Sequence, residues 1–337
     1  MNGLDLSKSY FEQYGLPMLE EQFPELLPFA AAGLCGSGSE CFGFDDAVSI
    51  DHDFEPGFCL FLPGEDIVDR RSAFLLERAY AHLPKEFEGF SRSLMQPVGG
   101  ARRGVLRIPE FLLEKTGTPD GVLTPAQWLT LPEESLAEAT NGRLFLDNYK
   151  ELTQVRERLR FYPEDIRRKK LAGHLLLMAQ AGQYNYLRCI RHDEAAAAQL
   201  AVFAFVKSTI SVIFLLNNVY QPYYKWSFRA LRALPVLSLE AELLEYLITT
   251  GNETADEGFS RDPADKTAPP ADEGGLIGGT AGEKYDVIEG IAADVIDELT
   301  NQDLTQAVCG DLEKHAYSVN DGIADAEIRN LHILAGV

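Results

Sequence analysis

The sequence predicts an α+β protein in which a mixed β-sheet with flanking helices comes first and a larger α-helical part follows. Over about the first 120 residues, short apolar runs alternate with turns and a helical segment, as expected where helices pack on a sheet. From about residue 125 to 247 the apolar residues follow the helical period. The 337 residues are 46% hydrophobic and 24% charged, proportions typical of a soluble globular protein of two or three domains.

The elements of the first part can be assigned in order along the chain. Residues 4–28 start as a helix that prolines punctuate. Buried strands are then expected over 29–35, 48–53 and 58–62, the last of which could also continue the second. A Gly/Ser turn over 36–39 follows the first strand. A helix over 67–83 and a short strand over 104–108 complete this part.

The second part is predicted to be helical. Thr124-Pro125 and Pro163 mark two helix starts. The most apolar stretch, Ala195–Leu216, contains Lys207 and four other polar residues, so we expect a buried core helix and not a membrane span. Further helices are expected over 225–234, 239–249, 283–316 and 325–334.

These elements predict a division into four segments. Residues 1–122 form the sheet domain and residues 123–250 a helical domain that binds substrate. Residues 251–282, rich in glycine, proline and acids, are expected to be a flexible acidic linker or loop. Residues 283–337 form a helical C-terminal segment that packs on the helical domain.

Charge is distributed unevenly along the chain. The total of −22 comes from 30 Lys and Arg against 52 Asp and Glu. Residues 1–66 carry a net −12, residues 67–250 a net +4 and residues 251–337 a net −14. The total disfavours long nucleic acids as partners, whereas the slightly basic middle still permits a short nucleic-acid end.

The five cysteines and the N-terminal residues indicate the compartment. The cysteines are widely spaced without a CxxC pair, which argues against a disulfide framework or a zinc site. Residues 1–20 lack the basic and apolar regions of a signal peptide. We therefore expect a cytoplasmic protein without a membrane partner.

The strongest candidate site combines a Gly-Ser turn with two aspartates. Gly38 and Ser39 follow the first predicted strand, and Asp51 and Asp53 lie in the second. Residues i and i+2 of a strand project to one side, so the two carboxylates form a predicted ligand pair for Mg²⁺ or Mn²⁺. The turn can cradle nucleotide phosphates. Each motif alone is more often a solvated turn, but together they predict a metal–nucleotide site.

The helical part contributes two more candidate clusters. Gln183, Tyr184 and Arg188 lie in a polar stretch that could bind substrate or brace a helix turn at Gly182. A second cluster follows residue 222, where Tyr224 could contact the substrate or its base, and Lys225, like Arg188, could bind triphosphate oxygens. An amphipathic helix with its arginines in water would explain the second cluster equally well.

The run from Gly33 to Leu62 resembles the nucleotidyltransferase superfamily that includes DNA polymerase β and kanamycin nucleotidyltransferase. Their shared pattern of Gly, Gly or Ser, a gap and Asp-x-Asp/Glu maps on Gly38, Ser39, Asp51 and Asp53. More narrowly, the chain resembles the DUF4037 family over most of residues 4–250 and the helical tail. This resemblance is carried by the strings GSGSECFGFDDAVSIDHDFEPGFCLFLP, RRGVLRIPEF, MAQAGQYNYLRCIRH and PYYKWSFRALRALP.

The resemblance implies a minimal nucleotidyltransferase domain followed by a helical substrate-binding domain. Such an enzyme transfers a nucleoside monophosphate from an NTP, here expected to be ATP, to a hydroxyl or phosphate acceptor. The superfamily often has a third carboxylate, for which Glu110 is the candidate and a surface role the alternative; Asp147 is an alternative general base. Other functions that remain open are an inactive nucleotide sensor or scaffold, and a toxin–antitoxin-type modifier of RNA ends.

Overall fold

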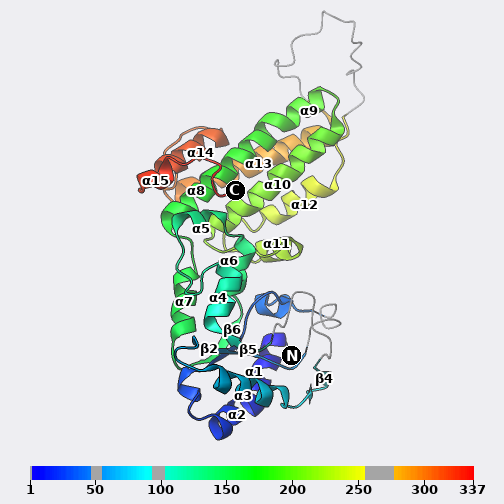
Figure 1. Ribbon diagram of the computed structural model, residues 1–337. Coiled ribbons are helices and arrows are strands. Elements are labelled where there is room, and N and C mark those ends of the chain that lie inside the picture. Colours follow the sequence, from blue (N-terminus) through cyan, green and yellow to red (C-terminus); the bar gives the residue numbers. More distant parts are fainter. Residues whose placement is uncertain (1, 47–54, 93–102, 255–276) are drawn as a thin grey trace, which may run out of the picture. The chain divides into compact units, whose positions relative to one another are not determined.

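The computed structural model describes residues 2–46, 55–92, 103–254 and 277–337 (Figure 1). The chain forms two compact units, Met1–Phe161 and Tyr162–Val337. The first combines a sheet with helices and the second is helical, as the predicted α+β class requires. Each unit is described by itself.

The boundary between the units corrects the predicted domain limit at residues 122 and 123. Residues 143–147, expected to be helical, form strand β6 (Arg143–Asp147), which pairs antiparallel with β1 (Ala31–Leu34). The predicted second domain therefore supplies a strand to the first unit. The helix that follows, α7 (Glu151–Leu159), is also part of this unit.

The first unit contains a four-stranded mixed sheet in the order β5-β2-β1-β6. β2 (Cys59–Leu62) runs antiparallel to β1, and β5 (Gly104–Arg107) runs parallel to β2. The register pairs Gly33 with Cys59 and Cys59 with Gly104. The end of β1 therefore lies at the same edge as the beginnings of β2, β5 and β6. We call this edge the Gly–Ser end, because the Gly/Ser turn follows β1 there.

The predicted strands over 29–35, 58–62 and 104–108 and the helix over 67–83 are confirmed as β1, β2, β5 and α3 (Arg70–Ala81). The strand predicted over 48–53 lies outside the described residues. Asp69 caps α3 by accepting hydrogen bonds from the N–H groups of Arg71 and Ser72. The other elements of this unit are α1 (Gly3–Tyr10), η1 (Phe11–Gly15), α2 (Leu16–Gln22), η2 (Leu27–Phe29), η3 (Ser39–Phe42), β3 (Glu86–Phe87), β4 (Phe90–Ser91), α4 (Ile108–Thr116), α5 (Pro125–Thr130) and α6 (Glu133–Thr140).

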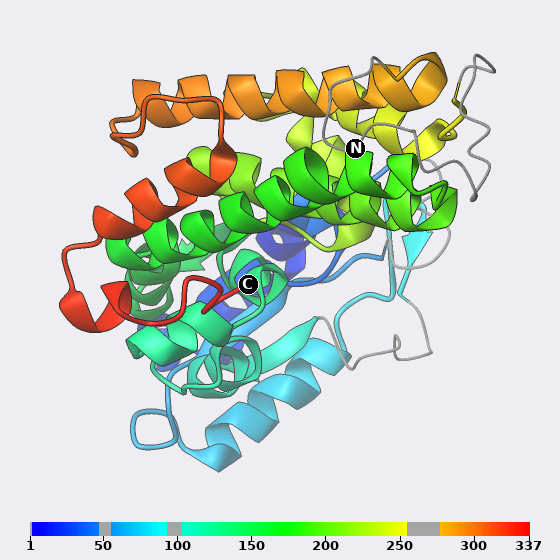
Figure 2. The ribbon, with the colours of Figure 1, turned by 90° about the horizontal axis from the view of Figure 1, so that it is seen from above.

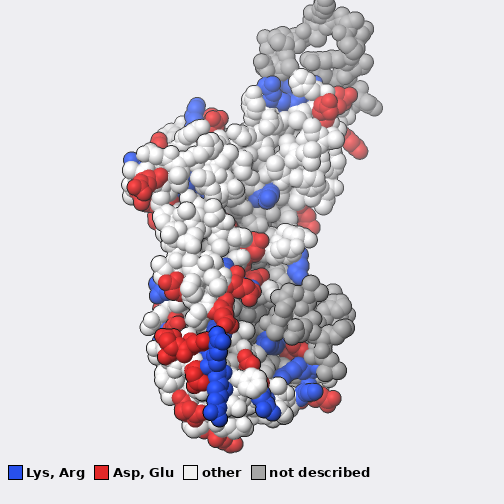
Figure 3. Space-filling view, in the orientation of Figure 1, with Lys and Arg blue, Asp and Glu red and all other residues white. Residues whose placement is uncertain are grey.

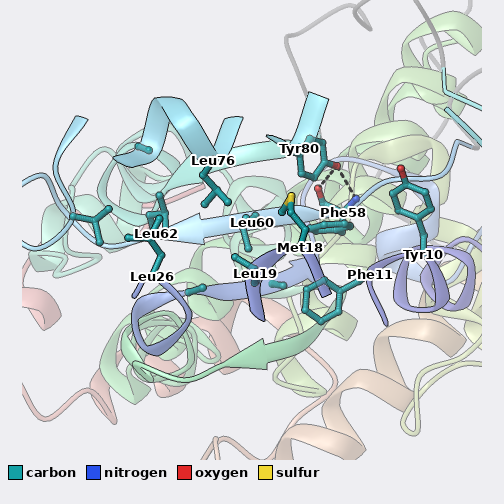
Figure 4. Close-up of a cluster of buried hydrophobic side chains, with 14 of the residues drawn as sticks. Tyr10, Phe11, Met18, Leu19, Leu26, Phe58, Leu60, Leu62, Leu76 and Tyr80 are labelled. Carbon is teal, nitrogen blue, oxygen red and sulfur yellow. Dashed lines mark hydrogen bonds between the residues drawn. The ribbon is translucent and has the colours of Figure 1, made fainter. Parts of the chain in front are cut away.

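The core of the first unit lies on one face of the sheet. Alternate residues of the strands, such as Ala32 and Leu60, pack against α1, η1, α2 and α3 (Figure 4). The Tyr80 hydroxyl fixes α3 to the edge of β2, since it donates to the carbonyl of Phe58 at 2.7 Å and accepts from its N–H at 3.0 Å. On the other face, Phe61 of β2 meets Phe111 of α4 edge-on. Helices therefore cover both faces of β2.

The second unit is built around one long, continuous helical segment and the helix that returns along it. The segment consists of α8 (Glu164–Met178), the π-helix η5 (Ala179–Tyr186) and α9 (Leu187–Arg191). After a tight turn, α10 (Ala195–Leu216) returns alongside α8 and η5, and Figures 1 and 2 show α13 beside the same segment. The remaining helices are α11 (Tyr224–Leu231), α12 (Glu240–Thr249), α13 (Gly279–Asn301), α14 (Leu312–Asp321) and α15 (Ala326–Arg329).

α10 confirms the prediction of a buried core helix over the most apolar stretch. It is long and apolar enough to cross a membrane, but 67% of its most apolar window is buried inside the protein. Side chains such as Phe205 and Phe214 are fully enclosed. This burial is consistent with the core helix of a soluble protein.

The helix predicted over 283–316 is interrupted. α13 ends at Asn301, because Asp303 adopts a left-handed φ of 54° and the N–H of Leu304 returns to the carbonyl of Leu299 at 2.9 Å. α14 begins at Leu312 and packs mainly on α8. The stretch predicted as one helix therefore forms two, α13 and α14, and α14 packs on the helical unit.

Candidate functional site

The Gly–Ser end of the sheet has a tightly held turn. Gly36 has a φ of 119°, which favours glycine. Its N–H donates to the Asn141 side-chain oxygen at 2.8 Å, and its carbonyl accepts from the Asn141 amide nitrogen at 2.7 Å. Asn141 directly precedes β6 in the neighbouring Asn141-Gly142 turn. A side chain from 105 residues away therefore fixes the backbone that leads to Gly38 and Ser39.

Gly38 and Ser39 occupy the start of η3, as its cap and first residue. Gly38 has an ordinary φ of −76°, so a turn conformation does not explain the glycine. A Cβ atom at this position would lie 2.4 Å from the Glu40 carboxylate, which folds back beneath it. A side chain at this position would therefore require the Glu40 carboxylate to move.

A buried arginine holds the Glu40 carboxylate in that position. Arg103, immediately before β5, donates to Glu40 at 3.0 Å and to Glu55 at 3.3 Å. The side chains of Arg103 and Glu40 are only 9% and 5% exposed. At low local dielectric such ion pairs are strongly coupled. Arg103 therefore joins Glu40, which follows Ser39, to Glu55, which follows the Asp51–Asp53 motif in the sequence.

The predicted metal ligands, Asp51 and Asp53, lie outside the described residues. Glu55, two positions after Asp53, is the first described residue beyond them. Within residues 2–46, 55–92, 103–254 and 277–337, no group of three or more His, Cys, Asp or Glu side chains could hold a metal ion. The prediction of a metal site therefore depends on the two aspartates of the motif.

Both further carboxylate candidates lie at the end of the sheet opposite the Gly/Ser turn. Glu110 is exposed in the first turn of α4, which begins where β5 ends. Asp147 is the last residue of β6 and pairs with Ala31 at the start of β1. Strands of four residues place these ends about 10 Å apart. We call this opposite edge the Asp147 end.

Asp147 has a structural role in closing the turn before α7. Its carboxylate accepts from the N–H of Lys150 at 2.9 Å, and from the N–H and hydroxyl of Thr153 at 2.8 and 2.6 Å. The residue is buried. These hydrogen bonds satisfy backbone N–H groups at the start of α7. They explain the burial of the Asp147 carboxylate without a catalytic role.

The cysteines near the Gly–Ser end are not suited to nucleophilic chemistry. Cys35, Cys41 and Cys59 are buried free thiols. Burial raises the pKa of all three thiols, which disfavours the reactive thiolate. They are packing residues around the end of β1.

The first helical cluster lies on the π-helix η5 and on α9. A cavity of about 470 Å³ is lined by Gln183 and Tyr184, among other residues. Gln183 donates to the Glu289 carboxylate and to the Gly310 carbonyl, both at 2.9 Å, and accepts from the N–H of Leu312 at 2.9 Å. The amide of Gln183 therefore braces η5 against α13 and the start of α14. Tyr184 is exposed, and its ring is covered by Arg188 at 4.9 Å.

The second cluster is at the other end of α10. Lys225 and Tyr224 open α11, which follows α10, whereas Arg188 lies in α9, which precedes it (Figure 1). With 22 residues, α10 is about 33 Å long. The two predicted triphosphate ligands, Arg188 and Lys225, therefore lie far apart in the second unit. They cannot both bind the same triphosphate.

The region from α5 to α11 contains both helical clusters and Asn141. A comparison with known protein families gives a match over this same region. The family model "Domain of unknown function (DUF4037)" matches residues 128–227. The DUF4037 match begins at Trp128 in α5 and ends at Ser227 in α11. It covers less than half of the chain, and Gly38 and Ser39 lie outside it. No match was found among curated proteins or among solved structures.

Sequence reasoning missed the residues that hold the Gly/Ser turn. Asn141, within the DUF4037 region, forms hydrogen bonds with Gly36, 105 positions earlier in the sequence. Arg103 pairs with Glu40, 63 positions earlier. One signal was available for Glu55, which continues the alternation of Asp51 and Asp53. A second was the Asn141-Gly142 pair, which is typical of a turn before a strand.

Proposed function

We propose that the protein is a metal-dependent nucleotidyltransferase that transfers a nucleoside monophosphate, with ATP the expected donor, to a hydroxyl or phosphate acceptor. One observation carries the proposal. Arg103 ties both flanks of the segment containing Asp51 and Asp53 to the Gly/Ser turn, through Glu40 and Glu55. Glu40 follows the turn and Glu55 follows the Asp51–Asp53 motif in the sequence, which supports a common role for the turn and the two aspartates.

The residues of the proposed site would have complementary tasks. Ser39 and the backbone N–H groups of the turn would bind phosphate oxygens of the nucleotide. Asp51 and Asp53 offer oxygen ligands two residues apart, a donor set that fits Mg²⁺. The bound ion would supply charge stabilisation for the departing pyrophosphate. Arg103 is a positioning residue here, since its charge is already shared by Glu40 and Glu55.

Calorimetric titration with Mg-ATP tests the site. We expect binding by the wild type and at least a tenfold loss in Asp51→Ala and Asp53→Ala. Glu110→Ala is the matched control, because it removes an exposed carboxylate at the Asp147 end. If the wild type fails to bind any nucleoside triphosphate with Mg²⁺ or Mn²⁺, the proposal is wrong.

A nucleotide sensor without catalytic activity would pass that titration, so transfer needs its own measurement. ATP labelled at the α-phosphate, incubated with the protein and a cell extract, should yield a labelled acceptor in the wild type only. Equal labelling by the Asp51→Ala and Asp53→Ala variants would exclude catalysis at this site. We expect the protein in the cytoplasm, where ATP and reduced thiols are available.

A further inference from the structure

A small cavity lies in the first unit between α7, the end of α6 and strand β6. It encloses about 290 Å³ and is lined by Thr140, Leu144, Thr153, Arg156, Glu157 and Arg160, all of them residues of the first unit. Helix α7 contacts both α6 and β6 there (Figure 1). No residue of the Gly/Ser turn lines this cavity. Its volume is at the lower end of the range for ligand pockets, so a ligand would have to be small.

The sequence of α7 places two arginines in the wall of the cavity. The buried side chains of α7 form one stripe along the helix. Thr153, Arg156, Glu157 and Arg160 follow the spacing i, i+3, i+4 and i+7, which puts them on a neighbouring stripe. Arg156 and Arg160 are therefore one helical turn apart and face the same space.

Arg156 uses only part of its guanidinium group inside the protein. Its Nη2 atom donates to the carbonyl of Thr140 at 2.7 Å and to the carbonyl of Asn141. These two bonds satisfy open carbonyl groups at the end of α6. A guanidinium has five N–H groups, and the Nε and Nη1 atoms have no hydrogen-bond partner in the described part of the chain. Three N–H donors of Arg156 are therefore left for a ligand.

The lining of the cavity has an excess of positive charge. Arg160 is exposed, and its guanidinium lies 5.1 Å from the centre of the Phe161 ring. Within the residues that the structure describes, neither Arg156 nor Arg160 forms an ion pair with a carboxylate. Two arginines against one glutamate, Glu157, give the lining a net charge of +1. In a protein of net charge −22, such a lining favours a small anion.

We propose that this cavity binds an oxyanion of the phosphate type between Arg156 and Arg160, at a site separate from the Gly/Ser turn. A guanidinium is planar and always charged, and its N–H groups match the spacing of phosphate oxygens. Two guanidiniums from successive helical turns can contact different oxygens of one tetrahedral phosphate. A carboxylate has only two oxygens, which a single guanidinium already fills. The pair of arginines therefore favours phosphate over carboxylate.

The threonine hydroxyls of the lining do not compete for this role. The Thr140 hydroxyl donates to the Leu136 carbonyl at 2.7 Å, and the Thr153 hydroxyl donates to the Asp147 carboxylate at 2.6 Å. Both hydroxyl protons are thus used inside the protein. Recognition of the anion depends on the two arginines alone.

Arg156 also connects the cavity with the Gly/Ser turn. Asn141, whose carbonyl accepts from Arg156, holds both backbone groups of Gly36. The N–H of the next residue, Gly142, donates to the carbonyl of Cys41 at 2.9 Å. Gly36 opens the Gly/Ser turn and Cys41 follows it by two residues. An anion that fixes Arg156 therefore favours the conformation of the turn.

This connection predicts that phosphate and Mg-ATP strengthen each other's binding. We expect saturating phosphate to raise the affinity for Mg-ATP about fivefold, and Mg-ATP to raise the affinity for phosphate by the same factor. The coupling rests on the proposed function, whereas the phosphate site itself does not.

Calorimetric titration with inorganic phosphate, without ATP or metal, tests the cavity. Phosphate should bind the wild type and bind Arg160→Met about tenfold more weakly, because one charge-assisted contact is lost. Arg156→Met should weaken binding as well, but it also opens the end of α6, so Arg160→Met is the decisive variant. Arg158→Met is the matched control. Arg158 lies on the same helix, donates to the Asp120 carbonyl at 2.9 Å and does not line the cavity, so its loss should leave phosphate binding unchanged.

Glu157 provides a test with the opposite sign. Glu157→Gln removes the one acid from the lining, and we expect it to strengthen phosphate binding about threefold, the range of a single charge interaction near the surface. A variant that only loosened the fold would weaken binding instead. Unchanged or weaker binding of phosphate by Glu157→Gln therefore contradicts the proposed site.

The remaining outcomes separate this inference from the proposed function. Absence of phosphate binding, equal affinities of the wild type and Arg160→Met, or equal weakening by Arg158→Met would overturn the site. Acetate bound as tightly as phosphate would overturn the choice of phosphate. Strict competition between phosphate and Mg-ATP would make the cavity part of the nucleotide site and so overturn a separate one. Failure of Mg-ATP to bind at all would refute the proposed function, while the phosphate titration still decides on the cavity.

Discussion

The two ends of the four-stranded sheet use buried charge in different ways. At the Gly–Ser end, Arg103 pairs with Glu40 and Glu55, which lie 63 and 48 positions earlier in the chain. At the Asp147 end, the buried carboxylate serves its own local turn, with all three hydrogen bonds made within six residues. The Gly–Ser end holds the Gly/Ser turn in place, whereas the Asp147 end caps the first turn of α7.

This difference teaches how to separate functional candidates from structural ones. A buried carboxylate whose acceptors are filled by local N–H groups is explained by capping alone. Burying an ion pair costs desolvation free energy. A buried pair between residues far apart in sequence is therefore a candidate for a functional role. On the first unit, exposed basic and acidic side chains lie next to each other (Figure 3). Such surface pairs cost little desolvation free energy and need no functional explanation.

The largest expected effect comes from breaking the Gly–Ser end at Arg103. Arg103→Met leaves the Glu40 and Glu55 carboxylates without their cation, and we expect the first unit to lose about 3–5 kcal/mol of unfolding free energy. Urea unfolding, followed by Trp128 in a Trp226→Phe background, reports on this unit. Mg-ATP affinity should fall with it.

The control for that experiment is the exposed pair of Arg70 and Glu65. Its atoms are 2.7 Å apart, but the Arg70 side chain is 84% exposed. Arg70→Met should cost less than about 1 kcal/mol. Similar losses in the two methionine variants would mean that burial at the Gly–Ser end does not strengthen the pair.

Breaking the Asp147 end should affect stability alone. Asp147→Ala leaves two backbone N–H groups and the Thr153 hydroxyl without their acceptor, a cost of about 2–3 kcal/mol. The folded variant should bind Mg-ATP as the wild type does and retain transfer activity. Loss of transfer at unchanged stability would instead restore Asp147 as the general base.

The sequence predicted those parts of the fold whose signals are local. β1, β2 and β5 are short apolar runs between turns, and α5 begins with a capping box at Thr124, as its Thr-Pro start suggested. β6 was missed because RLFLD is short and stands between two helical patterns. Its strand character comes from pairing with Ala31–Leu34, more than a hundred residues earlier.

The candidate site shows the same limit more sharply. The Gly38-Ser39 turn could be predicted because β1 precedes it directly. Glu110 was chosen because it follows a short strand, and position after a strand does not say at which edge that strand ends. β5 runs parallel to β2, which puts Glu110 at the far edge. Only the register of the sheet contains that information.

The Asn141 contact allows a smaller test with a matched asparagine beyond the other end of β6. Asn141 precedes β6 and holds Gly36, whereas Asn148 follows β6 and donates to the Leu27 carbonyl at 2.8 Å. Asn141→Ala should cost about 1–2 kcal/mol and weaken Mg-ATP binding. Asn148→Ala should leave that binding intact. Equal affinities of the two variants for Mg-ATP would contradict a role of Asn141 in shaping the nucleotide turn.

The smallest effect is expected from pH at the Asp147 end. Burial, then the nearby Asp147 and Asp66, raises the pKa of Glu151 above its usual 4.5. The folded unit therefore binds a proton more tightly than the unfolded chain, so its stability falls as pH rises from about 4.5 through the raised pKa. Glu151→Gln removes this charge, and because the side chain is only partly buried we expect a gain below about 0.5 kcal/mol at pH 7. Urea midpoints measured from pH 4 to 7 should decline less steeply in the variant than in the wild type. Parallel curves would mean that the folded unit does not raise the pKa of Glu151, and that this carboxylate does not destabilise the Asp147 end.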